Sequence, residues 1–187
     1  MRLRERTDCG RGSLSGAGVS LLLPDTPPNS SERAGTSVRA VCIDACFGAK
    51  LLLEEDLSKQ ASQLYRTWIE ERADVWVPEL FFWEVMNVIR KSYQRDDLTG
   101  QEAHEAADVL SRFRFRTPDL LTEGLSAYWH DWIEAFGYQV SAYDAAYLAT
   151  ATLVGCDLWT ADERLVRTVG DELGWVHSLG EFAASAD

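Results

Sequence analysis

Short apolar segments alternate with longer amphipathic segments from residue 39 onwards, and this order constrains the fold more than any other feature. The short segments have the length and apolar character of strands, and an aspartate or a proline ends the first two. They are RAVCID (39–44), DVWVP (74–78), CDLWT (156–160) and WVHSL (175–179), with FRFRTPDL (113–120) as an alternating strand candidate. Strands separated by helices favour an α/β sandwich, with a mainly parallel central sheet flanked by helices.

The segments between these strands carry apolar residues at helical spacing. In KQASQLYRTWIEER, apolar residues recur at helical spacing: Ala61, Leu64, Tyr65, Trp68 and Ile69. Pro78 occupies a permitted first-turn position, and Thr99 is a suitable N-cap. The predicted helices span residues 59–72, 78–94, 99–113, 121–137, 141–155, 162–174 and 180–186.

The first 38 residues differ from the rest of the chain. They contain scattered arginines followed by segments rich in glycine, serine and proline, and they have no amphipathic period. Such a composition is typical of disorder. We therefore expect residues 1–38 to form a disordered N-terminal extension and residues 39–187 to form a single domain.

Composition and charge narrow the class of protein. Apolar residues make up 46% of the chain and charged residues 26%, and no apolar run reaches the ~18 residues of a membrane span. The four cysteines form no C-x-x-C pair, which argues for reduced thiols in a cytoplasmic protein and against a zinc site. The net charge of −12 argues against a tight, non-specific DNA coat and suits a basic protein partner.

Four acidic residues occupy positions that can converge. Asp44 ends the first strand, and Asp162 follows the strand that ends at Thr160. Asp144 lies in the first turn of its predicted helix, and Glu84 lies within a helix on the same face as Leu80 and Val88. Ligands of such folds bind at the carboxyl ends of the strands, so these acids point to a site.

Helix capping is an alternative explanation for three of the four acids. Asp44 and Asp162 fit simple N-caps, and Ser141 with Asp144 fits a capping box. Glu84 lies too far into its helix to be a cap. A glutamate on an apolar stripe has to be solvated at a cleft, paired with a cation or protonated, because burying a lone charge is costly.

Converging carboxylates attract a divalent cation. Two unit charges about 4 Å apart repel by roughly 4 kcal/mol at an effective dielectric of about 20. Mg²⁺ and Mn²⁺ prefer oxygen ligands, and such ions activate water and stabilise charge on a phosphoryl group. The chain has no glycine-rich phosphate loop of the common spacings, so a nucleotide cofactor lacks support. The residue types favour metal-assisted hydrolysis of a phosphodiester.

The order of four motifs resembles the PIN-domain ribonucleases of the VapC toxin type. The motifs are VCIDA, PELFFWEVMNVIRK, SAYDAAYLATA and LWTADERL, and the resemblance covers about residues 39–184. It implies a PIN-like α/β/α sandwich over residues 39–187, RNA cleavage that depends on Mg²⁺ or Mn²⁺, and a cognate antitoxin. We also expect a homodimer and no membrane association.

The resemblance assigns roles to individual residues. Asp44 and Asp144 would be the principal metal ligands, while Glu84 and Asp162 would complete the acidic pocket and help orient the attacking water. Thr160 would contribute a supporting hydroxyl. One position departs from the family pattern, because the first motif usually has serine or threonine two residues after its aspartate, and here Cys46 stands there. A thiol is a weak donor, so a weaker support of the first acid is expected.

Two groups of basic residues are candidates for contacts to RNA phosphates. One group follows Glu84 on its helix and the other alternates with phenylalanines: Arg90, Lys91, Arg112, Arg114 and Arg116. A solvated face above a core is the alternative explanation for the alternating group. The aromatic segment YWHDWIEAF (128–136) fits a core, a dimer surface or an antitoxin groove.

Two other classes of function remain open at this stage. One is a PIN-like binding module without enzymatic activity. Loss of the hydroxyl at Cys46 would favour this class, and retention of all four acids argues against it. The other is a metal-dependent phosphatase that acts on small phosphoesters. Such enzymes usually need a nucleophile motif with a second aspartate, and DACFG lacks it.

Overall fold

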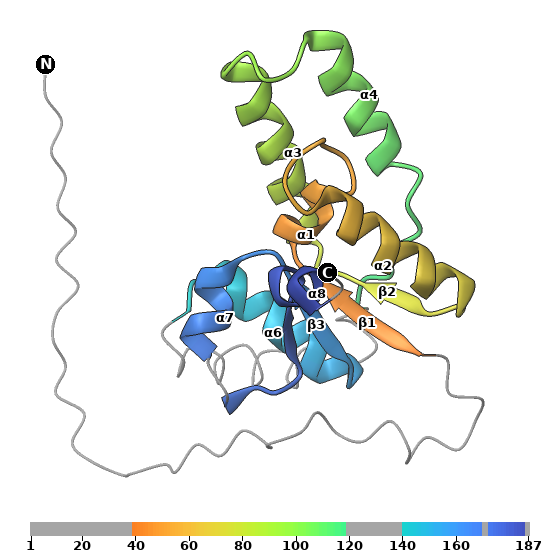
Figure 1. The fold of residues 1–187 in the computed structure, drawn as a ribbon, viewed down its shortest axis with the longest axis vertical. Coiled ribbons are helices and arrows are strands. Elements are labelled where there is room, and N and C mark those ends of the chain that lie inside the picture. Colours follow the sequence, from red (N-terminus) through yellow and green to blue (C-terminus); the bar gives the residue numbers. More distant parts are fainter. Residues whose placement is uncertain (1–38, 119–139, 170–171, 186–187) are drawn as a thin grey trace, which may run out of the picture.

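A computed structural model describes residues 39–118, 140–169 and 172–185. Within these ranges four strands form one sheet in the order β2-β1-β3-β4, and every pairing is parallel (Figure 1). The strands are β1 (Ala40–Ile43), β2 (Asp74–Trp76), β3 (Asp157–Thr160) and β4 (Val176–Ser178). The predicted parallel sheet is therefore confirmed.

The helices of the described residues follow most of the predicted segments. They are α1 (Ala45–Lys50), α2 (Ser58–Glu70), α3 (Leu80–Gln94), α4 (Gly100–Leu110), α6 (Ala142–Val154), α7 (Glu163–Val169) and α8 (Leu179–Ser185). Thr99 caps α4 in a capping box, and Gly155 ends α6 with a positive φ of 71°. None of these helices has the length and apolar character that crossing a membrane requires.

Two local expectations need correction, and one helix was missed. The segment 113–120 is not a strand, because within its described part it touches the sheet only through one bridge between Arg116 and Trp76. Pro118 follows closely and lacks the N–H that a longer ladder would need. Helix α3 begins at Leu80, after a turn at Pro78. Helix α1 follows β1 directly and was not expected at all, and the predicted helix 121–137 lies outside the described residues.

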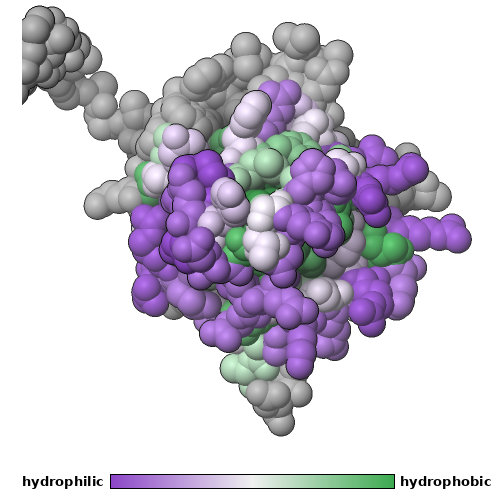
Figure 2. Space-filling model, turned by 90° about the horizontal axis from the view of Figure 1, so that it is seen from above, coloured by the Kyte–Doolittle hydropathy of each residue, from purple (hydrophilic) through white to green (hydrophobic). Residues whose placement is uncertain are grey.

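Helices cover both faces of the sheet. Cys42 pairs with Leu158 in the register, and the Cys42 thiol lies 3.9 Å from the carbonyl oxygen of Tyr147 on α6. Ile43 pairs with Trp159, whose ring contacts Trp68 of α2 and Phe182 of α8 on the opposite face. The arrangement is an α/β/α sandwich, as predicted. The outer face seen over α3 and α4 is mainly hydrophilic, with small separate apolar areas (Figure 2).

Strand order determines where a site can lie. The chain runs from β1 to β2 on one side and later returns to β3 on the other side, so the order reverses between β1 and β3. Ligands of open parallel sheets bind at such a reversal, at the carboxyl ends of the strands. The residues that follow Ile43 and Trp159 lie at this edge, and the Asp44 N–H donates to the Trp159 carbonyl at 3.2 Å.

Close packing between α1 and α3 generates a stability prediction. A Cβ added at the buried Gly48 would lie 2.5 Å from Cζ of Phe81, which is itself fully buried. Gly48→Ala should therefore lower the free energy of unfolding by about 1–3 kcal/mol, through overpacking. Gly100→Ala is the matched control, because its Cβ would meet only Tyr93 Cε2 at 3.8 Å and alanine favours a helix. Urea denaturation compares the two, and an equal stability of both variants would contradict the packing argument.

Candidate active site

Asp44 is the most buried of the four acids. It caps α1 immediately after β1, and its side chain is nearly enclosed, with 5% of the residue exposed. The Phe47 N–H donates to Oδ1 at 2.7 Å, and the Thr160 hydroxyl donates to Oδ2 at 2.5 Å. Thr160 is fully buried and also accepts from the Asp162 N–H at 2.8 Å. One hydroxyl thus ties the ends of β1 and β3 together.

Asp162 and Asp144 both cap helices, and each leaves one oxygen out of its cap. Asp162 Oδ1 accepts from the N–H groups of Arg164 and Leu165 at the start of α7. Asp144 Oδ2 accepts from the N–H and hydroxyl of Ser141, so the predicted capping box is present. Among the described residues, no hydrogen bond reaches Asp144 Oδ1 and none from a backbone N–H reaches Asp162 Oδ2.

Glu84 is held against α6 by a tyrosine. The Tyr147 hydroxyl donates to Glu84 Oε2 at 2.6 Å, although 63 residues separate the two in sequence. Burial and the contact with Glu84 raise the pKa of Tyr147, which keeps the phenol protonated as a donor. Sequence analysis missed Tyr147 as a support for Glu84. Its only signal is its position in α6, one helical turn after Asp144.

Electrostatic interactions link the four acids. Burial raises the pKa of Asp44 to about 7; the hydrogen bonds from Thr160 and Phe47 oppose this shift, and the charges of Asp162 and Asp144 add to it. The pKa of Glu84 is raised by burial and by Asp144, against the effect of Tyr147. The Cys46 thiol, which is exposed in the first turn of α1, has its pKa raised by desolvation and then by all four carboxylates.

Arg164 is a second residue that sequence analysis did not select. Its Nη2 lies 3.2 Å from Asp144 Oδ2 and 3.5 Å from Asp162 Oδ2. The guanidinium therefore spans two of the four acids. The available signal was its position two residues after Asp162, in the first turn of α7, but nothing in the sequence shows that the side chain folds back.

The predicted RNA-contacting residues lie on two other surfaces. Arg90 and Lys91 are exposed on α3, where Arg90 bonds to Asn87 and Gln94. Arg116 pairs with Asp74 at 2.8 Å and lies over the Trp76 ring, at the β2 edge of the sheet. Arg112 and Arg114 are exposed, while Phe113 and Phe115 pack against Tyr65, so the predicted alternation of faces is present. Their role toward RNA stays a prediction.

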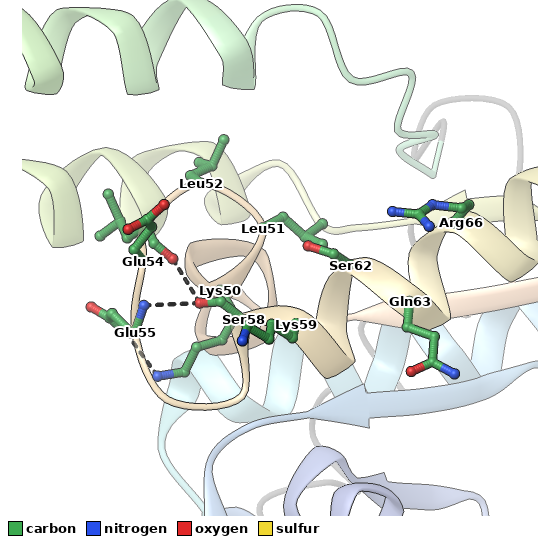
Figure 3. A pocket seen from close by; sticks show the side chains of 11 residues that line it. Lys50, Leu51, Leu52, Glu54, Glu55, Ser58, Lys59, Ser62, Gln63 and Arg66 are labelled. Carbon is green, nitrogen blue, oxygen red and sulfur yellow. Dashed lines mark hydrogen bonds and ion pairs between the residues drawn. The ribbon is translucent and has the colours of Figure 1, made fainter. Parts of the chain in front are cut away.

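A separate hollow of about 820 Å³ lies beside the loop between α1 and α2 (Figure 3). Its lining includes Lys50, Lys59 and Arg66, and Lys50 is paired with Glu55 at 2.7 Å. None of the four acids lines it, because Asp44 lies at the opposite end of α1. The hollow therefore does not belong to the acidic site.

The donor types at the acidic site fit Mg²⁺ or Mn²⁺. All four side chains offer carboxylate oxygens, which these ions prefer, and a cation would offset the repulsion that helps raise the pKa of Asp44. In the part of the chain that the structure describes, no three His, Cys, Asp or Glu side chains already stand in position around a common metal. Ligation would thus require rotation of the half-buried carboxylates of Glu84, Asp144 or Asp162, while Thr160 and Phe47 hold Asp44 in place.

Comparison with known families agrees with this geometry. A model of the PIN domain matches residues 41–171, which is more than half of the chain. The chain belongs to the PIN-domain family. PIN domains are typically metal-dependent nucleases, and residues 41–171 include all four acids as well as Thr160 and Arg164. A comparison with curated proteins found no match to this chain.

The raised pKa of Asp44 predicts how the PIN domain responds to pH without metal. Between about pH 4 and 7 the folded protein keeps a proton that the unfolded chain has lost, so stability falls as pH rises through this range. One linked proton changes the free energy of unfolding by roughly 1 kcal/mol per pH unit. Urea denaturation at several pH values in a chelator should show a smaller fall for Asp44→Asn than for the wild type. Identical slopes would contradict the assignment.

Proposed function

We propose that this PIN domain is a metal-dependent endoribonuclease, with Asp44, Glu84, Asp144 and Asp162 as its acidic site. The observation that carries the proposal is the environment of Asp44. A nearly enclosed carboxylate is held by a neutral hydroxyl and a backbone N–H, and its pKa is raised by burial and further by two neighbouring carboxylates. Folding alone gains little from this clustering of charge, whereas a cation site requires it.

The four acids have different roles in the proposed site, and each is held by its own supporting residues. Asp44 and Asp144 are the principal ligands, with Thr160 orienting Asp44 and Ser141 orienting Asp144. Glu84, held by Tyr147, and Asp162 complete the pocket and orient the attacking water. When bound, Mg²⁺ or Mn²⁺ supplies an activated water and charge stabilisation at the phosphoryl group. Cys46 offers no strong hydrogen bond to Asp44, and Thr160 provides that support instead.

Exposed aromatic side chains favour RNA over a small phosphoester as the substrate. Trp83 directly precedes Glu84 and is 79% exposed, and Tyr143 directly precedes Asp144 and is 60% exposed. Both aromatics stand on the helices that carry site acids, and single-stranded nucleic acids stack on exposed aromatic side chains of this kind, at about 1–3 kcal/mol per base. A small phosphoester has no use for such surfaces.

Substitution of Asp144 tests the proposed chemistry. Asparagine retains an oxygen for the bonds from Ser141 and loses the charge and the oxygen that is outside the cap. Asp144→Asn should fold normally, with metal-free stability unchanged or higher, and should cleave RNA slower by at least about 100-fold. The measurement is cleavage of an RNA oligonucleotide against Mg²⁺ concentration, together with thermal melts with and without metal.

The control for this experiment is Asp108→Asn, which makes the same charge change on the exposed side of α4. It should cleave as the wild type does. Full cleavage by Asp144→Asn at low Mg²⁺ would show that Asp144 acts only as a helix cap and not as a metal ligand. Wild-type activity on a small chromogenic phosphoester but not on RNA would favour a phosphatase, and tight RNA binding without cleavage would favour a binding module.

We further propose that the ribonuclease is the toxin of a toxin–antitoxin pair. The resemblance to VapC-type motifs and the net charge of −12 support a basic, arginine-bearing antitoxin segment as partner. Arg164 supports the chemistry of such a contact, since one guanidinium already pairs with Asp144 and Asp162. The homodimer stays a proposal, and the aromatic segment 128–136 lies outside the described residues.

The antitoxin proposal predicts a stable complex with the product of the adjacent reading frame. Co-expression should yield both proteins in one chromatographic peak, and the complex should cleave RNA more slowly than the free domain. Replacing the arginines of the partner by glutamine should weaken the complex, because the acids lose their counter-charges. Separate elution of the two proteins at micromolar concentration would contradict the pairing.

A further inference from the structure

Arg164 is placed so that it can respond to the state of the acidic site. Its backbone N–H is fixed by Asp162 Oδ1 at 2.8 Å, at the first turn of α7. Its guanidinium reaches back to Asp144 on α6 and to the second oxygen of Asp162. The main chain is thus anchored at the site, while the charged end of the side chain bridges two separate elements.

Among the basic residues of the described ranges, Arg164 alone forms ion pairs with these acids. Within the described ranges, no other lysine, arginine or histidine forms an ion pair with Asp44, Glu84, Asp144 or Asp162. Arg167 lies on the same short helix, is also exposed, and forms no such pair. The contact of Arg164 is therefore specific to its position and is not a general property of basic residues on α7.

The contact is weak enough to be exchanged. The Arg164 side chain is 64% exposed, and ion pairs of this kind contribute little to stability because solvent screens them. Capping does not depend on the guanidinium, since Asp162 Oδ1 already accepts two backbone N–H groups of α7. A divalent cation held by several carboxylates competes effectively with a single solvated guanidinium.

We propose that Arg164 alternates between the acids and the RNA. Without metal, its guanidinium is the resident counter-ion of Asp144 and Asp162. Once these carboxylates ligate a cation, the guanidinium leaves them and binds a phosphate oxygen of the RNA next to the scissile bond. This inference rests on the proposed ribonuclease function, and it adds a phosphate-contacting residue to the four acids.

The chemistry of arginine suits both positions. A guanidinium presents a planar fork of N–H donors that matches carboxylates and phosphates equally well, and it stays charged at any working pH. A fixed positive charge beside a phosphoryl group stabilises the charge that develops during hydrolysis. Lysine keeps the charge and loses the fork, so Arg164→Lys should retain part of the function.

The test compares Arg164→Gln with Arg167→Gln, which make the same charge change on one helix. Calorimetric titration of the metal-free full chain with Mn²⁺ should show tighter binding by Arg164→Gln, by about 3- to 10-fold relative to Arg167→Gln, because a competing cation is gone. At saturating Mn²⁺, cleavage of a single-stranded RNA by Arg164→Gln should fall at least 10-fold. Arg164→Lys should lie between, and Arg167→Gln should match the wild type. Thermal melts confirm that each variant folds.

The outcomes separate this inference from the function on which it rests. Equal Mn²⁺ affinity of the two glutamine variants overturns the counter-ion role, whether or not RNA is cleaved. Undiminished cleavage by Arg164→Gln at saturating Mn²⁺ overturns the phosphate contact. A wild-type protein that binds Mn²⁺ but cleaves no RNA refutes the ribonuclease and the phosphate contact together, and the Mn²⁺ titration then decides the counter-ion role alone.

Discussion

The hydrogen bond from the Thr160 hydroxyl to Asp44 joins the two central strands at the point where the strand order reverses. It gives a partner to a carboxylate that is almost fully enclosed, and a buried carboxylate without partners would be strongly destabilising. The same hydroxyl accepts from the backbone of Asp162, so the start of α7 is positioned by the same residue. The relative positions of Asp44 and Asp162 therefore depend on this one side chain.

Helix capping and metal binding are compatible roles for the acids. A carboxylate has two oxygens, and at Asp144 and Asp162 the cap uses one of them. The capping oxygen fixes the side chain at the start of its helix, and the other oxygen lies outside the cap; at Asp162 this second oxygen is the one that Arg164 contacts. A helix start holds a carboxylate rigidly, so the capping seen in the structure does not conflict with the proposed metal role.

Periodicity was sufficient to predict the fold, because most of the apolar residues in the predicted patterns are buried; in α2, Ala61, Leu64 and Trp68 are buried, while Ile69 is exposed. The positions of Asp44 and Asp162 followed from the rule that parallel strands end at one edge. What was missed involves contacts between segments far apart in sequence. Tyr147 meets Glu84 across 63 residues, and Arg164 meets Asp144 across 20 residues. The prediction of a strand at 113–120 was wrong for a related reason. Phe113 and Phe115 alternate with arginines because their rings pack against Tyr65, and not because the segment pairs as a strand.

The central claim is that the four acids form one metal site at the edge between β1 and β3. A crystal structure of the full chain grown with Mn²⁺, with anomalous scattering used to locate the ion, tests it most directly. The account predicts an ion at this edge, with oxygens of Asp44 and Asp144 among its ligands and the guanidinium of Arg164 displaced from Asp144 and Asp162. An ion bound only elsewhere in a Mn²⁺-saturated crystal, with both pairs of Arg164 intact, would contradict it.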